Sequence, residues 1–518
     1  MKTFVTVVTT LLLAGSACAA ENQTETAGDS TDFQVNIIKE IFSYDVFNKL
    51  DKNALVNKYD ITGTIHDISS SIRSQKGQRP HTDKVISSIP PQGIVIKNPG
   101  TYTFSGDLTW NPESVPCAAI TIIADKVVLD MGNFNLTAMV QNNNEFIAGI
   151  CIRNASAVTI RNGTLANMSL YGIYAVQVSS LRIKNVTVSG ISLSNLNIRN
   201  LCPAGILIDK ARKIHLTDCT VQNLQVTSDS SAGIQLLNTT KGVVSGCRVR
   251  NLVNNDGSVQ GYSYIQSENI TTSNCRADNF QSHFNGNINT TGHTVLGFIP
   301  IFCSNLKYEN CSATNMIGCC DDCHGMSVFL DAKVAVTNFT ANTVIDGVAQ
   351  SNSGAKATGL EVYGVDVSIR NCSVKNIKAI NPQDKQSAGF SAWGARITFT
   401  DCKASNVVVC DENGNENPAL GYGTGFGWAP DPRYPFRDIG AYRVAYNGCS
   451  ARDCQVGFDT WFHVNSTWTN VDCTHCDINI LVEPDGQRTL SCNPCSECNP
   501  PIDIVIKNIA RGNTYPPL

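Results

Sequence analysis

The stretch AGICIRNASAVTIRNGTLANM, residues 148–168, is followed by YGIYAVQVSSLRIKNVTVSG, residues 171–190, and the two share one pattern. The pattern returns in AGILIDKARKIHLTDCTVQNL, residues 204–224, and in AGIQLLNTTKGVVSGCRVRNL, residues 232–252. Each copy contains three short runs in which apolar and polar residues alternate, with no helical spacing between them. Alternation at a period of two predicts β-strands. Each copy is therefore expected to form one coil of three strands.

A glycine near the start of each copy anchors the repeat. Gly205, Gly233 and Gly261 stand 28 residues apart, and other intervals differ in length. A coil this short cannot bury its own inner face, but stacked coils bury one continuous core. The repeat therefore predicts an all-β, parallel β-helix of about twelve coils. The anchoring glycines are Gly149, Gly172, Gly205, Gly233, Gly261, Gly297, Gly325, Gly359, Gly389, Gly425 and Gly457.

A second regularity places a tight turn twelve or thirteen residues after the glycine in nine of the eleven anchored copies. The residue there is always Asn, Asp or Gly, the types that enter the left-handed backbone region at low cost. We therefore expect a bent turn between the second and third strands, with the length variation falling in loops beside the first strand. The positions are Asn162, Asn185, Asp218, Gly246, Asn274, Asn310, Asn338, Asn371 and Asp401.

Over residues 90–480 the repeat resembles the pectin-lyase-like superfamily of right-handed parallel β-helices. The resemblance implies the handedness of the coil and a functional groove along the first strands and the long loops. It does not imply one activity, because the superfamily includes lyases, hydrolases, epimerases, phage tailspikes and adhesins.

The ends of the chain differ from the repeat. Residues 1–20 resemble a signal peptide: Lys2 precedes an apolar run too short to span a bilayer, and small residues follow. A lipid anchor on Cys18 is an alternative. Residues 21–90 form a polar segment and then a run with helical spacing of apolar residues, expected to cap the helix. The β-helix is expected over residues 91–483, and a Cys- and Pro-rich tail over residues 484–518.

Composition narrows the class of protein. The 518 residues are 42% hydrophobic and 16% charged, with a net charge of -4 and no basic or acidic block. This balance excludes a disordered chain and disfavours a nucleic-acid partner or electrostatic membrane docking. No stretch after the signal is long and apolar enough to cross a membrane. We expect a protein secreted to the periplasm, the cell surface or the medium.

Two groups stand out among the 22 cysteines, and Cys473 belongs to both. One group begins the third strand of successive coils and is expected to point inward, either as a buried stack of small side chains or as bridged pairs. The other contains Cys473-x-x-Cys476 and Cys492-x-x-Cys495, whose spacing fits zinc or, after export, disulfides. We expect disulfides and no metal there. The first group is Cys219, Cys247, Cys275, Cys311, Cys372, Cys402, Cys449 and Cys473.

The densest group of chemically active residues is CCDDCHG, residues 319–325. Asp321, Asp322 and His324 are candidate catalytic residues, since polygalacturonases carry paired aspartates and a His-Gly in their coils. Here the aspartate pair lies earlier relative to the strand, and no Asn-Thr-Asp or Arg-x-Lys motif accompanies it. The alternative is a cysteine-pinned loop with aspartates as turn residues.

The outward positions of the later first strands gather aromatic residues and carboxylates, a combination that suits sugar rings. Tyr363, Trp393 and Trp461 are candidate substrate-binding residues, and Glu361 and Asp459 are candidate acids. Those two carboxylates lie three coils apart, roughly 14 Å, whereas glycosidase pairs need about 5–9.5 Å. They are therefore not expected to act as a pair. The aromatic residues have an alternative role as a small core beneath a loop.

An insertion at residues 427–443 contributes two further candidates, Arg433 and Arg437. A lyase needs a base and a cation that holds the substrate carboxylate, although arginines in loops are more often solvated. No cofactor is expected, except Ca²⁺ if the protein is a lyase.

Two functions remain open from the sequence. The first is an enzyme, lyase or hydrolase, that recognises or modifies a polysaccharide or glycoconjugate. The second is a non-catalytic adhesin or structural β-helix protein, which the lack of a clear catalytic pair favours.

Overall fold

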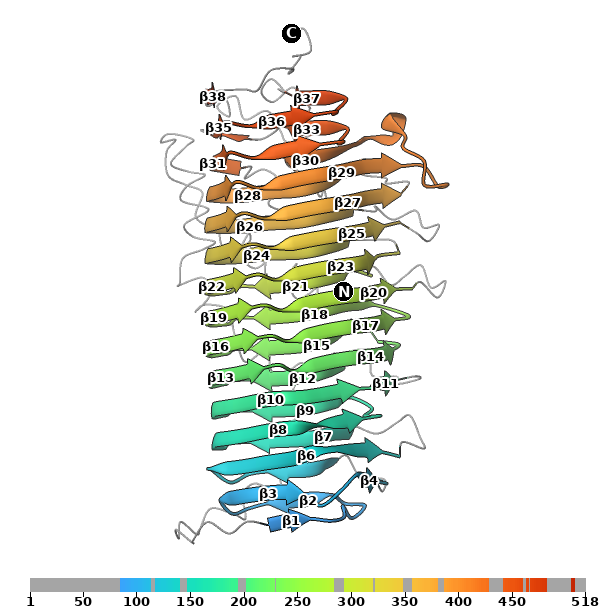
Figure 1. Cartoon of the computed structure of the whole chain (residues 1–518), viewed down its shortest axis with the longest axis vertical. Coiled ribbons are helices and arrows are strands. Elements are labelled where there is room, and N and C mark those ends of the chain that lie inside the picture. The colour runs from blue at the N-terminus through green and yellow to red at the C-terminus, as the bar shows by residue number, and fades with distance from the viewer. Residues whose placement is uncertain are drawn as a thin grey trace, which may run out of the picture.

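The computed structural model describes residues 84–112, 117–139, 147–193, 202–228, 230–283, 293–319, 322–347, 356–380, 386–427, 441–459, 463–464, 466–481 and 505–507. In this part the chain winds into a stack of coils, and its strands belong to one 38-stranded hydrogen-bonded sheet (Figure 1). Each coil pairs in parallel with the next, as Ile206 with Ile234 and Thr220 with Arg248 show. The predicted parallel β-helix is confirmed. The predicted signal peptide, residues 1–20, and residues 21–83 of the predicted N-terminal segment lie outside the described residues. Lys84–Ile86, within that segment, form a strand that pairs with the sheet.

The first strands of the coils form one column. It consists of β2 (Ile94–Ile96), β5 (Cys117–Ile122), β7 (Ile147–Arg153), β9 (Tyr171–Val176), β12 (Ala204–Asp209), β15 (Ser230–Leu237), β18 (Ser258–Ile265), β21 (Val295–Ile301), the start of β24 (Asp322–Thr337), β26 (Lys356–Arg370) and β28 (Gln386–Thr400), then β30 (Tyr422–Gly427), β33 (Val456–Asp459) and β37 (Ile478–Leu481).

The second strands form a second column. It consists of β1 (Lys84–Ile86), β3 (Gly100–Phe104), the starts of β6 (Val127–Ala138), β8 (Ser156–Ala166) and β10 (Ser179–Ser189), then β13 (Arg212–Thr217), β16 (Thr240–Ser245), β19 (Glu268–Ser273), β22 (Ser304–Glu309), the ends of β24, β26 and β28, and β31 (Ala441–Asn447), β34 (His463–Val464), β35 (Thr467–Thr469) and β38 (Val505–Lys507).

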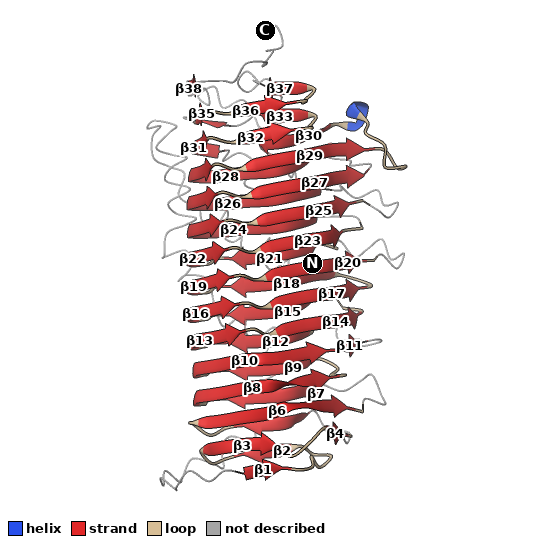
Figure 2. Cartoon of the chain, in the orientation of Figure 1, coloured by secondary structure: helices blue, strands red, loops and turns tan. Residues whose placement is uncertain are grey.

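The third strands complete each coil. They are β4 (Leu108–Trp110), the ends of β6, β8 and β10, β11 (Ser192–Leu193), β14 (Thr220–Val226), β17 (Arg248–Asn254), β20 (Arg276–Ser282), β23 (Ser312–Ile317), β25 (Thr340–Asp346), β27 (Ser373–Ile380), β29 (Lys403–Cys410), β32 (Ser450–Arg452) and β36 (Asp472–Thr474). A short 3₁₀ helix, η2 (Pro418–Leu420), follows β29 (Figure 2).

The turns behave as the sequence predicts. Asn162, Asn185, Asn274 and Asn310 all have a positive φ, between 52° and 57°. Their side chains also join neighbouring coils, because the amide of Asn185 donates to Asn162 at 3.3 Å and that of Asn310 donates to Asn274 at 3.4 Å. The constant spacing from the glycine therefore reflects a real register.

A second asparagine ladder escaped the sequence analysis. Asn251 donates to Asn223 at 3.0 Å, and Asn279 donates to Asn251 at 2.9 Å. All three have a positive φ, so each third strand contains a second bend. The offset of five residues from the first turn was visible in the sequence.

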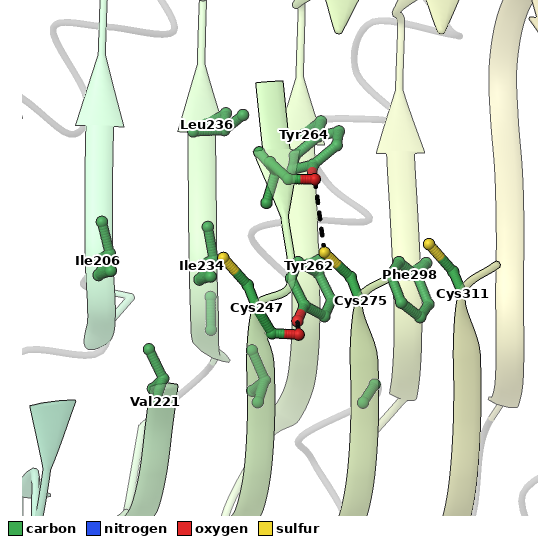
Figure 3. Close-up of a cluster of buried hydrophobic side chains, with 14 of the residues drawn as sticks. Ile206, Val221, Ile234, Leu236, Cys247, Tyr262, Tyr264, Cys275, Phe298 and Cys311 are labelled. Atoms are coloured by element: carbon green, nitrogen blue, oxygen red, sulfur yellow. Dashed lines mark hydrogen bonds between the residues drawn. The ribbon is translucent and has the colours of Figure 1, made fainter. Parts of the chain in front are cut away.

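The inner faces of the columns make the core (Figure 3). Ile206, Ile234, Tyr262 and Phe298 are register partners on successive first strands, and each is buried. The hydroxyl of Tyr262 donates to the carbonyl of Cys247 at 2.7 Å, so the core phenol is satisfied.

The cysteine ladder lies in this core. Cys219, Cys247, Cys275 and Cys311 are buried, and they are free thiols in the structure (Figure 3). Hydrogen bonding to the Cys247 thiol and burial both raise the pKa of Cys219 well above its usual value. The ladder is therefore a buried stack of small side chains, which is the first of the two predicted alternatives. Within the described residues no disulfide joins any pair of cysteines. Cys492, Cys495 and Cys498 lie outside them.

The glycine anchors have a steric cause. A Cβ on Gly233 would lie 2.2 Å from a methyl group of Val249 and 2.8 Å from the carbonyl oxygen of Gly261. The first strand thus passes so close to the third strand and to the next coil that a side chain cannot fit.

Candidate functional site

The parts of β24 and β26 that belong to the first-strand column bring four ionisable side chains together on their outward side. Asp322 pairs in register with Lys356, and Ser327 pairs with Glu361. His324 lies on the same side of β24 as Ser327, because both side chains approach the carboxylate of Glu361. We call Asp322, His324, Lys356 and Glu361 the charged cluster.

Glu361 is the centre of the charged cluster. Its carboxylate contacts the ammonium group of Lys356 and accepts a hydrogen bond from the hydroxyl of Ser327 at 2.9 Å. Nδ1 of His324 lies 3.5 Å from Oε2 of Glu361, and Nε2 of the same ring lies 3.9 Å from Oδ1 of Asp322. The imidazole is thus held between two carboxylates.

The cluster is buried, and its electrostatics follow from that. Burial raises the pKa of Glu361, but the attraction of Lys356 and His324 and hydrogen bonds from Lys356 and Ser327 outweigh it, so the pKa is lowered. Glu361 is therefore a carboxylate at neutral pH. The four residues are only 3–5% exposed. Such burial is costly unless the charges are paired, and here they are.

An aromatic row continues from the cluster along the helix axis. Phe329 packs on Tyr363 with ring centroids 5.2 Å apart, and Tyr363 stacks on Trp393 at 4.9 Å. The ammonium group of Lys356 lies 6.0 Å from the centre of the Tyr363 ring. None of the three rings belongs to the core inside the coils. They face outward, as the alternation predicts.

The aromatic rings are not exposed to solvent, as the rings of an open sugar-binding surface would be. Trp393 is 2% exposed and Tyr363 is 4% exposed, so both rings are covered. The alternation of residues reveals which side of a strand a side chain is on, but not whether something lies over that side. Their role in binding substrate stays a prediction.

The backbone next to the site is irregular. A register shift separates Phe329 from Asp331, and Leu330 between them has a φ of 57°. The carboxylate of Asp331 holds this bend, because it accepts from the backbone N–H groups of Cys303 at 2.5 Å and of Phe329 at 3.1 Å. Burial raises the pKa of Asp331 well above its usual value.

The other candidate site residues do not belong to the charged cluster. Glu361 pairs with Ser391, Ser391 pairs with Gly427, and Asp459 lies on the next strand beyond Gly427. Asp459 is therefore three coils from Glu361, which agrees with the expectation that the two do not form an acid–base pair. Asp321, Arg433, Arg437 and Trp461 lie outside the described residues.

Two residues of the site were missed from the sequence, Ser327 and Lys356. Both could have been found from their distance to the anchoring glycine. Lys356 and Asp322 each precede their glycine by three residues, and Ser327 and Glu361 each follow theirs by two. Residues with equal offsets from their glycines are register partners on neighbouring coils. Charged pairs between coils can therefore be predicted from the sequence.

Metal binding was not expected, and Ca²⁺ only for a lyase. Within the described residues no group of three or more His, Cys, Asp or Glu side chains is arranged to hold a metal ion. In the same part of the chain no helix has the length and hydrophobicity needed to cross a bilayer.

Comparisons with known proteins give distant likenesses. No protein-family model matches the chain, and no curated protein matches its sequence. Among solved structures, the catalytic domain of a GH87 alpha-1,3-glucanase is 13% identical, with a TM-score of 0.37 over 85% of this chain and 70% of that one. Pectate lyase Pel9A is 12% identical, with a TM-score of 0.36 over 56% of this chain and 78% of that one.

A third likeness is the A-module of the mannuronan C-5 epimerase AlgE4 from Azotobacter vinelandii. It is 10% identical, with a TM-score of 0.31 over 75% of this chain and 90% of that one. At such identities and TM-scores these likenesses carry no argument about activity. The assignment of the fold rests on the strand register described above.

Proposed function

We propose that this protein is a secreted enzyme that modifies a polysaccharide or glycoconjugate, with the charged cluster as its acid–base machinery. The observation that supports this most is the burial of Asp322, His324, Lys356 and Glu361 on the outward side of strands whose inward side already supplies the core. Packing does not require ionisable groups there, and clusters of buried, interacting ionisable groups mark functional sites more often than other places.

The geometry assigns each residue a part. His324 is the group that would take or give a proton, because imidazole does so near neutral pH. Glu361 and Asp322 flank its two ring nitrogens and orient the ring, and both would stabilise an imidazolium. Lys356 keeps Glu361 ionised, so Glu361 is not the general acid. The aromatic row of Phe329, Tyr363 and Trp393 would face a sugar ring.

The second candidate function is non-catalytic binding or a structural role at the cell surface. The covered state of Tyr363 and Trp393 favours it, since a closed face suits a structural cluster as well as an active site. Under this alternative the charged cluster serves to fix neighbouring coils to one another.

An activity screen separates the two. Purified full-length protein is incubated with polyuronides and with neutral glycans, and new unsaturated or reducing ends are measured. The enzyme proposal expects activity on at least one glycan and its loss, by about 100-fold or more, in His324→Ala. His215→Ala is the matched control, because His215 lies on β13 in the second-strand column, away from the first-strand face. Full activity in His324→Ala would overturn the assignment of the base.

A further inference from the structure

Three polar side chains on the first-strand face lack hydrogen-bond partners among the described residues. They are Gln260, through Oε1, and the hydroxyl groups of Ser263 and Thr358. All three are nearly or fully buried, with exposed fractions of 2% or less. Native structures rarely leave such groups unsatisfied, and each one calls for an explanation.

These groups belong to the same face as the charged cluster. Gln260 pairs with Leu296, Leu296 pairs with His324, and His324 pairs with Thr358. Ser263 lies between Tyr262 and Tyr264, which both point into the core, so its hydroxyl points outward (Figure 3). Gln260 and Thr358 thus continue the row of His324 in both directions along the helix axis, and Ser263 has the same offset from its glycine as Ser327.

The chemistry of the three groups restricts the ligand. Oε1 of Gln260 only accepts hydrogen bonds, so its partner must be a donor. The hydroxyl groups of Ser263 and Thr358 both donate and accept. Sugar hydroxyls satisfy all three, whereas a carboxylate cannot donate to Gln260.

The charges on this face also restrict the ligand. Between β18 and β33 the described outward residues include the acids Asp322, Glu361 and Asp459, and the one lysine among them, Lys356, contacts Glu361. His324 lies between two of the acids. In this part of the face no surplus of positive charge is left to hold an anionic sugar.

We propose that the ligand of this face is a neutral, hydroxyl-rich glycan, and that Gln260, Ser263 and Thr358 bind its hydroxyl groups. This inference rests on the proposed function. It names the substrate class and adds three binding residues on either side of His324. Ser258 and Thr294, joined by a 3.0 Å hydrogen bond, extend the neutral character of the face at its β18 end.

The test is a binding titration of the full-length protein with dextran and laminarin as neutral probes and polygalacturonate and alginate as anionic ones. We expect the neutral glycans to bind, with little dependence on salt. Thr358→Val and Ser263→Ala should each weaken that binding about 2- to 10-fold, the contribution of one hydrogen bond. Neither should lower the melting temperature, because each removes a polar group that has no partner in the folded protein.

Thr239→Val is the matched control. Thr239 is also fully buried, but its hydroxyl donates to the carbonyl of Leu237 at 3.2 Å. This variant should lose stability and keep its affinity for glycan. Neutral-glycan binding that is unchanged in Thr358→Val and Ser263→Ala would overturn the assignment of these residues. Preferred binding of polygalacturonate or alginate would overturn the neutral class and leave the proposed function standing. Binding of no glycan would overturn both.

Discussion

The coil around β12 and the coil around β26 use the same scaffold for different outward surfaces. On the inward side β12 carries Ile206 and Ile208, and β26 carries Leu360 and Val362, all fully buried. The same three offsets from the glycine, three before, one before and two after it, hold Cys202, Ala204 and Leu207 in the coil of β12. In the coil of β26 they hold Lys356, Thr358 and Glu361. The fold constrains only the inward residues. The outward positions are free to vary, and the later coils carry ionisable and hydroxyl side chains there.

The largest expected effect comes from breaking the charged cluster. Glu361→Ala leaves the ammonium group of Lys356 buried without its carboxylate, and this should lower the free energy of unfolding by about 3–5 kcal/mol. Denaturant unfolding of the variant and the parent measures the difference. The double variant Lys356→Met/Glu361→Met is the control, because it removes both charges and should regain most of the loss.

The pH dependence of stability tests whether the carboxylate of Glu361 is paired in the folded protein. The pKa of Glu361 is lowered in the folded protein from a usual value of 4.5. Its contribution is therefore fully present above pH 4.5 and is lost as the pH falls through the lower, folded-state pKa. Glu361→Gln should flatten the acid limb of the profile. An unchanged acid limb would show that the carboxylate is not paired as described.

A smaller loss of stability is expected from truncating a residue of the aromatic row, and a still smaller loss from truncating its counterpart in an early coil. Trp393→Ala removes a ring that stacks on Tyr363 and is 2% exposed, and should cost about 3 kcal/mol. Val176 occupies the same offset from its glycine on β9, and Val176→Ala should cost about 1 kcal/mol. Equal and small losses in both variants would indicate that Trp393 is exposed in solution and available to a ligand.

The turns, which both regions share, should give an intermediate effect. Asn274→Val forces a β-branched residue into a φ of 54° and should cost about 1–2 kcal/mol. Asn274→Gly keeps the backbone permissive and should be close to the parent in a thermal melt. A destabilised glycine variant would assign the effect to the side-chain hydrogen bond with Asn310 instead of to the backbone.

The smallest effect is expected for an ion pair on the exposed surface. Arg396 forms two hydrogen bonds with Asp366, at 2.6 Å and 3.0 Å, and both side chains are more than 40% exposed. Water and salt screen such pairs, so Asp366→Asn should change stability by less than about 1 kcal/mol. A loss as large as that of Glu361→Ala would mean that burial does not explain the difference between the two pairs.

The residues that were predictable share one property, a fixed offset from the glycine. Asn162, Asn185, Asn274 and Asn310 could be placed because a left-handed turn admits few residue types. Glu361, Tyr363 and Trp393 could be placed on the outward side because strand residues alternate. The sequence did not indicate that Tyr363 and Trp393 are covered, since burial on that side depends on more than the alternation within a strand.

The charged cluster was only half predictable. Asp322, His324 and Glu361 stood out as residue types. The contact of Lys356 with Glu361 joins two residues five apart on β26, and the hydrogen bond of Ser327 with Glu361 joins residues 34 apart on neighbouring coils. The residue type of Leu330 does not signal a positive φ, but its offset of five residues from the glycine does, because Asn154 and Asn238 have a positive φ at the same offset.

The direction of the hydrogen bonds has a mechanical consequence. The bonds between coils run along the axis of the stack, so a force that pulls the two ends apart loads the coils one after another and not all at once. The coils should then unfold one at a time, beginning at the least stable end of the stack. Where the repeat is 28 residues long, each released coil would lengthen the chain by about 95 Å, given about 3.4 Å per extended residue.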